Sequence, residues 1–398
     1  MQSLKVILIT LVACFLLAAC EKTAPLAPND SELLDGPIEG LTGEQQKRFL
    51  NGDIAFNDEV FSVANGLGPV FVATSCGTCH AGDGKGHPFT SLTRFGQRDE
   101  TGNQFLHLGG PQLQHRALPG FSPEQLPAGA PFSKFLPPAN TGLGLLEIVP
   151  DATLLALADP EDTDGDGISG RPNWIALPNY LSPRPDAISQ DGKYIGRFGK
   201  KAAVYDLLQQ TVNAYNQDIG IASFFEPFDT YTGEEIDPEV SNQTIHDVVF
   251  YLRTLKAPIP RDVDRVAVSA GKMLFEQIGC AKCHVPTLNA GTSPIAPLAF
   301  REFYPYTDLL LHDMGSELDD GYTEGSAKTS EWRTPSLWGL GLAKNSQGGQ
   351  YFLLHDGRAH SIEAAIILHG GEGIQSREAY GQLTADEKNQ LITFLESL

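Results

Sequence analysis

The sequence of 398 residues is poor in basic side chains: 28 Lys and Arg stand against 49 Asp and Glu, a formal net charge of −21. Proteins that bind nucleic acid need basic patches to neutralise phosphates, so this balance argues against a nucleic-acid partner. Charged residues make up only 19% and hydrophobic residues 41%, which excludes general disorder. Ordinary solubility accounts for this acidity, and the alternative is a docking face for a small basic electron-donor protein or another periplasmic redox partner.

Long apolar runs are absent after the first nineteen residues, so no later segment offers the ~18 consecutive apolar residues of a membrane helix. Residues 1–19 combine one Lys, an apolar run and a small-residue end, which predicts a signal peptide. The stretch Leu17–Cys20 resembles a bacterial lipobox, so we expect a lipoprotein signal peptide over 1–19, lipid on Cys20 and a flexible tether over 20–45. This predicts a protein on the periplasmic side of a bacterial membrane, the outer membrane in particular. An ordinary signal peptide or an uncleaved anchor is the alternative.

Cysteine is scarce, with six residues in all, and one each lies in the signal peptide and the lipobox. The other four belong to two copies of C-x-x-C-H, the signature of c-type haem attachment. The two thiols add to the haem vinyl groups, and the adjacent His becomes the proximal iron ligand. The sequence therefore predicts two covalent haem c groups, held by Cys76, Cys79, His80, Cys280, Cys283 and His284.

Three other uses of these cysteines fit the pattern less well. Two disulfides would suit an exported protein but do not require His after the second Cys both times. A four-Cys zinc site would need knuckles about 200 residues apart in sequence to converge. A thioredoxin-like pair needs a βαβ context, which neither motif has.

The haem motifs sit in a repeated pattern. A helical stretch, 269–277, precedes the second motif, and apolar stripes at helical spacing predict closing helices over 243–256 and 384–398, the latter with Thr384 as N-cap. A helix, a haem motif, loops and a closing helix is the plan of a cytochrome c. The expected fold is mainly α, with two cytochrome c-like haem domains and long ordered loops. Pro residues after the first closing helix place the boundary at 258, with an N-terminal domain over 46–258 that carries a large insertion and a C-terminal domain over 259–398.

The insertion contains a possible calcium loop. Asp162, Asp164 and Asp166 alternate and are followed by Gly167, as at the start of an EF-hand. Position 12 is Asn173 rather than Glu, so a true EF-hand is not expected. The alternatives are a calcium ion on the three Asp side chains and an acidic surface turn.

Methionine is the scarcest candidate for an axial iron ligand. After Met1 the chain has Met273, which lies on an apolar helix and is expected in the core, and Met314. Met314 and His312 are both plausible sixth ligands. His246 lies on a closing helix and is expected to be an ordinary helix residue.

Six stretches together resemble the di-haem oxidoreductase branch, also labelled thiol oxidoreductases, of the bacterial di-haem cytochrome c peroxidase superfamily. The resemblance runs from about residue 50 to the C-terminus, and the motifs come in the family's order. The stretches are GLGP at 66–69, GLGLLE at 142–147, DGDGISGRPN at 164–173, WRTPSLWGL at 332–340, YFLLHDGRA at 351–359 and IEAAIILHGG at 362–371.

For the second haem, the resemblance implies a distal ligand fourteen residues after the histidine of the His-Asp-Gly motif. That histidine is His355, so the ligand is His369, where many peroxidases have Met. A bis-His haem on His284 and His369 follows, with Met314 as the alternative. Met is the ligand that raises haem potential, so a bis-His haem is the weaker oxidant. Relatives often have Trp where Lys200 stands, so a tryptophan relay between the haems is not expected.

For the first haem, the resemblance implies a catalytic centre with a nearby Gln and Glu. By order along the chain, Gln112, Gln114 and Glu147 are the candidates. The side chains that would instead cap this iron are those of His87, His107 and His115.

Three functions follow as hypotheses. The first is a peroxidase-like oxidoreductase, in which peroxide is reduced at the His80 haem and electrons arrive through the His284 haem. The second is a non-catalytic di-haem electron-transfer lipoprotein. The third is a substrate-specific oxidase or oxygenase that uses the same haem pair.

Overall fold

The computed structural model describes residues 28–398, so the predicted signal peptide and Cys20 lie outside the described residues. By their contacts, residues 34–398 form one compact unit, and a 3₁₀ turn at Asp30–Glu32 lies outside it. None of the helices described is both long enough and apolar enough to cross a membrane.

Helices carry most of the regular structure, and four of the longer ones begin at side-chain caps, which are Thr42, Asp206, Ser241 and Thr384. Thr384 accepts a hydrogen bond from the Glu387 N–H, which confirms it as the predicted N-cap. The predicted helices 243–256, 269–277 and 384–398 correspond to α6, α7 and α11. The α-helices are α2 (Gly43–Asp53), α3 (Leu143–Glu147), α4 (Asp151–Leu157), α5 (Leu207–Ile219), α6 (Asn242–Thr254), α7 (Val266–Gln277), α8 (Ala343–Ser346), α9 (Ile362–Ile367), α10 (Ile374–Gln382) and α11 (Ala385–Ser397).

The strands over residues 28–398 have four residues at most and form small antiparallel sheets between loops. The pairs are β1 with β3, β2 with β4, β8 with β9 and β10 with β11, and β7 lies between β5 and β6. This arrangement matches the expected class, mainly α with long ordered loops. The strands are β1 (Val70–Phe71), β2 (Leu92–Phe95), β3 (Arg116–Ala117), β4 (Phe132–Phe135), β5 (Trp174–Ile175), β6 (Ser189–Gln190), β7 (Lys193–Ile195), β8 (Leu288–Asn289), β9 (Glu302–Phe303), β10 (Leu311–Asp313) and β11 (Glu331–Arg333).

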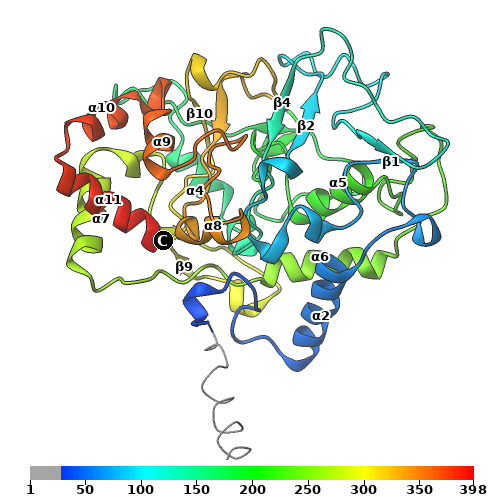
Figure 1. Cartoon of the computed structure of the whole chain (residues 1–398), viewed down its shortest axis with the longest axis horizontal. Coiled ribbons are helices and arrows are strands. Elements are labelled where there is room, and N and C mark those ends of the chain that lie inside the picture. Colours follow the sequence, from blue (N-terminus) through cyan, green and yellow to red (C-terminus); the bar gives the residue numbers. More distant parts are fainter. Residues whose placement is uncertain (1–27) are drawn as a thin grey trace, which may run out of the picture. The chain divides into compact units, whose positions relative to one another are not determined.

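Two helix pairs have the same close contact. Helix α2 packs on α6, and α7 packs on α11, beside which it lies in Figure 1. A Cβ on Gly52 of α2 would lie 2.1 Å from the Asp247 carbonyl oxygen of α6. A Cβ on Gly271 of α7 would lie 2.1 Å from the Gln390 carbonyl oxygen of α11. Each helix before a haem motif therefore meets its closing helix backbone to backbone, through a glycine that no larger residue can replace without a shift.

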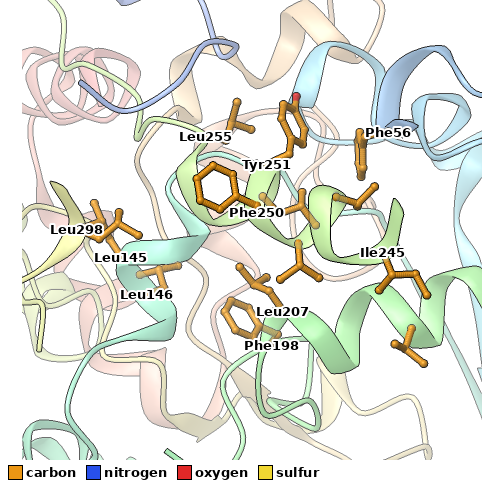
Figure 2. Packing of buried hydrophobic residues seen from close by; sticks show 14 of the residues in the cluster. Phe56, Leu145, Leu146, Phe198, Leu207, Ile245, Phe250, Tyr251, Leu255 and Leu298 are labelled. Atoms are coloured by element: carbon orange, nitrogen blue, oxygen red, sulfur yellow. The ribbon is translucent and has the colours of Figure 1, made fainter. Parts of the chain in front are cut away.

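The hydrophobic core does not divide at residue 258. Figure 2 shows the main cluster around α6, with Leu145 and Leu146 of α3 facing it. Leu298 and other apolar residues between 288 and 310 belong to this first cluster, although they follow the second haem motif in sequence. A second cluster is built around α7 and α11. The second half of the chain thus contributes to both cores.

Candidate functional site

The two C-x-x-C-H motifs have the same local structure. A 3₁₀ turn spans Cys76–Thr78 in the first and Cys280–Lys282 in the second. The N–H of His80 donates to the Cys76 carbonyl at 3.0 Å, and the N–H of His284 donates to the Cys280 carbonyl at 3.0 Å. The four cysteines of the two motifs are free thiols, so neither pair forms a disulfide. Burial raises the pKa of the first thiol of each motif to about 12.

Both motif histidines are held in the same tautomer. The Nδ1 atoms of His80 and His284 lie 3.0 Å from the carbonyl oxygens of Pro138 and Tyr306, respectively. A carbonyl cannot donate, so Nδ1 carries the proton and Nε2 keeps its lone pair. Burial lowers the pKa of both imidazoles to about 4, so both are neutral at pH 7. A neutral imidazole with Nδ1 bonded to a carbonyl is the form that binds iron.

An aromatic ring packs beside each of these imidazoles. The ring centre of Phe56 is 5.8 Å from that of His80, and the ring centre of Phe275 is 6.5 Å from that of His284. Phe56 and Phe275 each lie four residues after the glycine of a helix–helix contact. The two halves of the chain therefore repeat both the glycine contact between helices and the phenylalanine ring that packs beside the motif histidine.

One continuous cavity is lined by all six residues of the two haem motifs. The volume of this cavity is about 430 Å³, and most of its walls are apolar. Free thiols, neutral imidazoles and apolar walls in one cavity fit two covalent haem groups, whose porphyrin rings need apolar contact. Thioether bonds would come from the four Cys residues, and proximal ligation from the two His residues.

His369 has the geometry of a second iron ligand. It follows α9, and its Nδ1 donates to the Ala365 carbonyl at 2.7 Å, which again leaves Nε2 with its lone pair. The side chain lines the same cavity, and after burial its charge is the next contribution that lowers the pKa of His284. Met314 also lines the cavity, where it packs against the cluster of Phe135 and Trp332.

We expect His369→Ala to open the second iron. In the oxidised protein, the low-spin electron paramagnetic resonance signal of one haem should be lost and a high-spin signal should appear. The matched variant Met314→Leu removes the other candidate from the same cavity and should leave the low-spin signal unchanged. The opposite pattern, with the change in Met314→Leu alone, would assign the ligand to Met314.

The prediction of His312 as an iron ligand is wrong, because both of its ring nitrogens are taken. Nε2 lies 2.8 Å from Asp308 Oδ2, and Nδ1 lies 2.6 Å from Glu372 Oε2. Burial opposes a proton on this ring, but the Asp308 carboxylate and the other partners raise the pKa of His312 well above its ordinary value. His312 is therefore an imidazolium held between carboxylates.

The other histidines are also committed or remote. His355 bonds Asp320 through Nε2 at 2.8 Å and stacks on Trp332, with ring centres 3.7 Å apart. His87 packs against Phe89 and Phe352. The three predicted caps of the first iron, His87, His107 and His115, do not line the cavity, and His107 and His115 are exposed.

The structure separates the predicted residues of the first haem site. Gln112 lines the cavity, whereas Gln114 and Glu147 do not. The Gln114 amide donates to the Asn216 carbonyl at 3.3 Å. Glu147 is buried and binds Arg253 through both carboxylate oxygens, at 2.6 and 3.0 Å. Its Oε1 also accepts the N–H that begins α5, which gives Glu147 a structural role.

Asp218 is the carboxylate that the sequence analysis missed. It lies near the end of α5, lines the cavity and accepts a hydrogen bond from Gln112. Burial raises the pKa of Asp218 to about 6, against the hydrogen bond from Gln112 and the charge of Arg94. A signal was present in the sequence: Gln210, Asn213 and Gln217 give α5 a polar stripe at helical spacing, and all three line the cavity.

The predicted calcium loop is rearranged. Carboxylate oxygens of Asp159, Asp162 and Asp164 lie within 4.8 Å of one another, so the cluster starts at Asp159. Asp166 instead forms an ion pair with Lys282 at 3.0 Å. Asn173 is buried, and its amide donates to two backbone carbonyls away from the loop. Calcium at Asp162, Asp164 and Asp166 stays a prediction.

Two haem-attachment motifs that open into one cavity define a di-haem redox protein. A family profile described as "Di-haem oxidoreductase, putative peroxidase" matches residues 137–398, about two thirds of the chain, and the chain belongs to this family. The matched segment contains the second C-x-x-C-H motif and begins after the first.

Two solved structures are similar to this chain at low identity. One is the hydrazine synthase of Kuenenia stuttgartiensis, with 15% identity, 94% of each chain covered and a TM-score of 0.41. The other is a MauG-like protein associated with microbial copper homeostasis, with 18% identity, 64% of this chain and 87% of the other covered, and a TM-score of 0.32. No curated protein matches the chain.

Proposed function

We propose that this protein is a di-haem c-type cytochrome oxidoreductase that reduces peroxide at the His80 centre and receives electrons through the His284 centre. One observation carries the proposal. Both motifs open into one cavity. Within residues 28–398, three further imidazoles line this cavity, those of His312, His355 and His369. The Nε2 atoms of His312 and His355 are hydrogen-bonded, whereas that of His369 is free. One capped and one open iron is the arrangement that an enzyme needs. Haem, when bound, supplies the iron that binds peroxide and exchanges electrons.

Asp218 is our candidate for the proton carrier at the open centre. Gln112 holds its Oδ1 by a hydrogen bond, so Oδ2 is left to take a proton from peroxide and return it to the departing oxygen. Its pKa of about 6 means that the carboxylate is mostly ionised at pH 7 and can act as the base. Glu147 is less suited to this role, because both its oxygens are bound to Arg253 and it lies outside the cavity lining.

We further propose the cellular setting. Lipid on Cys20 would hold the protein at the periplasmic side of the membrane. A small basic redox protein would then donate electrons, because the formal net charge of −21 attracts a partner of opposite sign.

Electron paramagnetic resonance and peroxide turnover test the proposal together. The oxidised and half-reduced holoprotein should show a high-spin ferric signal in at least one state, and hydrogen peroxide should change that signal. Peroxide should also oxidise a reduced small cytochrome in the presence of the protein. Low-spin signals alone in both states, with no turnover, would favour the non-catalytic electron carrier. A peroxide-sensitive iron without cytochrome oxidation would favour the oxidase or oxygenase.

A further inference from the structure

Three basic side chains from distant parts of the chain meet in the cavity that both haem motifs line, and we call them the cationic cluster: Lys85, Lys200 and Arg333. Each lines the cavity. Lys85 follows the first motif by five residues, and Arg333 ends β11. The N–H of Arg333 donates to the Lys200 carbonyl at 2.9 Å, and its Nε donates to the Gly199 carbonyl at 3.0 Å. The backbone therefore fixes Arg333 against the segment that carries Lys200.

The two lysines of the cluster have no partner for their charge. Within residues 28–398, neither the Lys85 nor the Lys200 ammonium makes a hydrogen bond or an ion pair, although the chain has 49 acidic residues. The neighbouring Lys201 differs. Its ammonium donates to the carbonyl oxygens of Lys328, Thr329 and Glu331. Of these two adjacent lysines, the one that lines the cavity is therefore the one whose ammonium has no partner within residues 28–398.

The two carboxylates closest in effect to the cationic cluster are already bound to other side chains. Asp356 faces Lys200 and Asp308 faces Arg333, but Asp356 is bound to Arg358 at 2.7 Å and Asp308 to His312 at 2.8 Å.

The charges within the cluster also oppose one another. Burial, followed by the charges of Lys85 and Arg333, lowers the pKa of Lys200 to about 7. Burial alone lowers the pKa of Lys85 to about 8. Half-buried cations that repel one another are costly when no anion lies beside them, so the cluster favours an occupant of the cavity that brings negative charge.

Carboxylates are the anions that suit this cluster. Each haem carries two carboxylates on its rim, and lysine and arginine bind carboxylates by charge-assisted hydrogen bonds. We propose that Lys85, Lys200 and Arg333 bind haem carboxylates between the two centres, and that the charge of Lys200 raises the reduction potential of the haem beside His80. A cation favours the reduced iron, which carries one positive charge less. Lys200 is close enough for its charge to contribute to the lowered pKa of His80. This inference rests on the haem groups of the proposed function and not on peroxide chemistry.

A spectroelectrochemical titration of the Lys200→Met holoprotein tests the inference. We expect one haem to titrate at lower potential, so that the ratio of reduced to oxidised haem at the wild-type midpoint falls about tenfold, or 59 mV for one electron. Lys193→Met removes an exposed lysine seven residues earlier and should cause no shift. Lys200→Arg keeps the charge and should stay near the wild-type potential. Lys85→Met should shift the potential in the same direction and serves if Lys200→Met yields no holoprotein.

Three outcomes would overturn the inference. In the first, Lys200→Met and Lys85→Met both titrate as the wild type. In the second, Lys200→Met converts a low-spin iron to high spin, which would make Lys200 an iron ligand. In the third, acetate causes a saturable spectral shift in the wild type that Lys200→Met lacks, which would assign the cluster to a free carboxylate. Failure of the proposed function is separate, because peroxide turnover can be absent while the potential shift and the haem content stand.

Discussion

Replacement of both Cys76 and Cys79 by Ser is expected to halve the covalently bound haem of the purified protein. The two thiols line the cavity beside His80, and a serine hydroxyl does not add to a haem vinyl group. The measurement is the haem-to-protein ratio from the alkaline pyridine spectrum after extraction of unattached haem with acidified acetone. Before extraction, the spectrum of the native variant should show a six-coordinate low-spin haem, because the second centre has His369 as a candidate sixth ligand.

The second motif provides the matched control. Replacement of Cys280 and Cys283 by Ser should remove the other half of the covalent haem and leave the centre beside His80. A variant with all four replacements should carry none. If either pair can be replaced without loss of covalent haem, that motif is not an attachment site, and the di-haem assignment of this chain fails.

Asp218→Asn is expected to lower peroxide turnover by roughly 10²- to 10⁴-fold, the usual contribution of a positioned acid–base group. The amide keeps the size of the side chain and removes the base. In the wild type, the rate should rise with pH through about 6, because the raised pKa of Asp218 means that the base is protonated and inactive below this value. In Asp218→Asn this rise should be absent. Steady-state kinetics between pH 5 and 8 measure both effects.

Glu147→Gln is the matched comparison for this experiment. The same chemical change is made at the carboxylate that binds Arg253 outside the cavity lining. We expect Glu147→Gln to lower the thermal stability of the protein and to leave the pH profile of turnover in place. If the profile is lost in Glu147→Gln and kept in Asp218→Asn, the proton carrier is Glu147.

The two C-x-x-C-H motifs, the helices that flank them and the family could be recognised from the sequence. Cys76–His80 and Cys280–His284 are local motifs, because covalent attachment needs both thiols and the histidine within one turn of chain. The closing helices were recognisable because a buried face must repeat every three to four residues, as it does in α6. His369 was expected from the family resemblance, which implies a ligand fourteen residues after His355, and its side chain lies in the cavity with a free Nε2.

The partners of polar side chains were decided by the tertiary structure alone. Glu147, Asp218 and His312 are polar residues whose own sequence neighbours do not show which side chain each of them meets. Glu147 meets Arg253 from 106 residues away, and His312 meets Glu372 from 60 residues away. Lys200 and Lys201 are adjacent in sequence, yet the Lys201 ammonium donates to three carbonyls, whereas Lys200 lines the cavity and binds no anion among residues 28–398. Local spacing determines the two C-x-x-C-H motifs and the helix faces, whereas long-range packing determines which charges are neutralised within the chain.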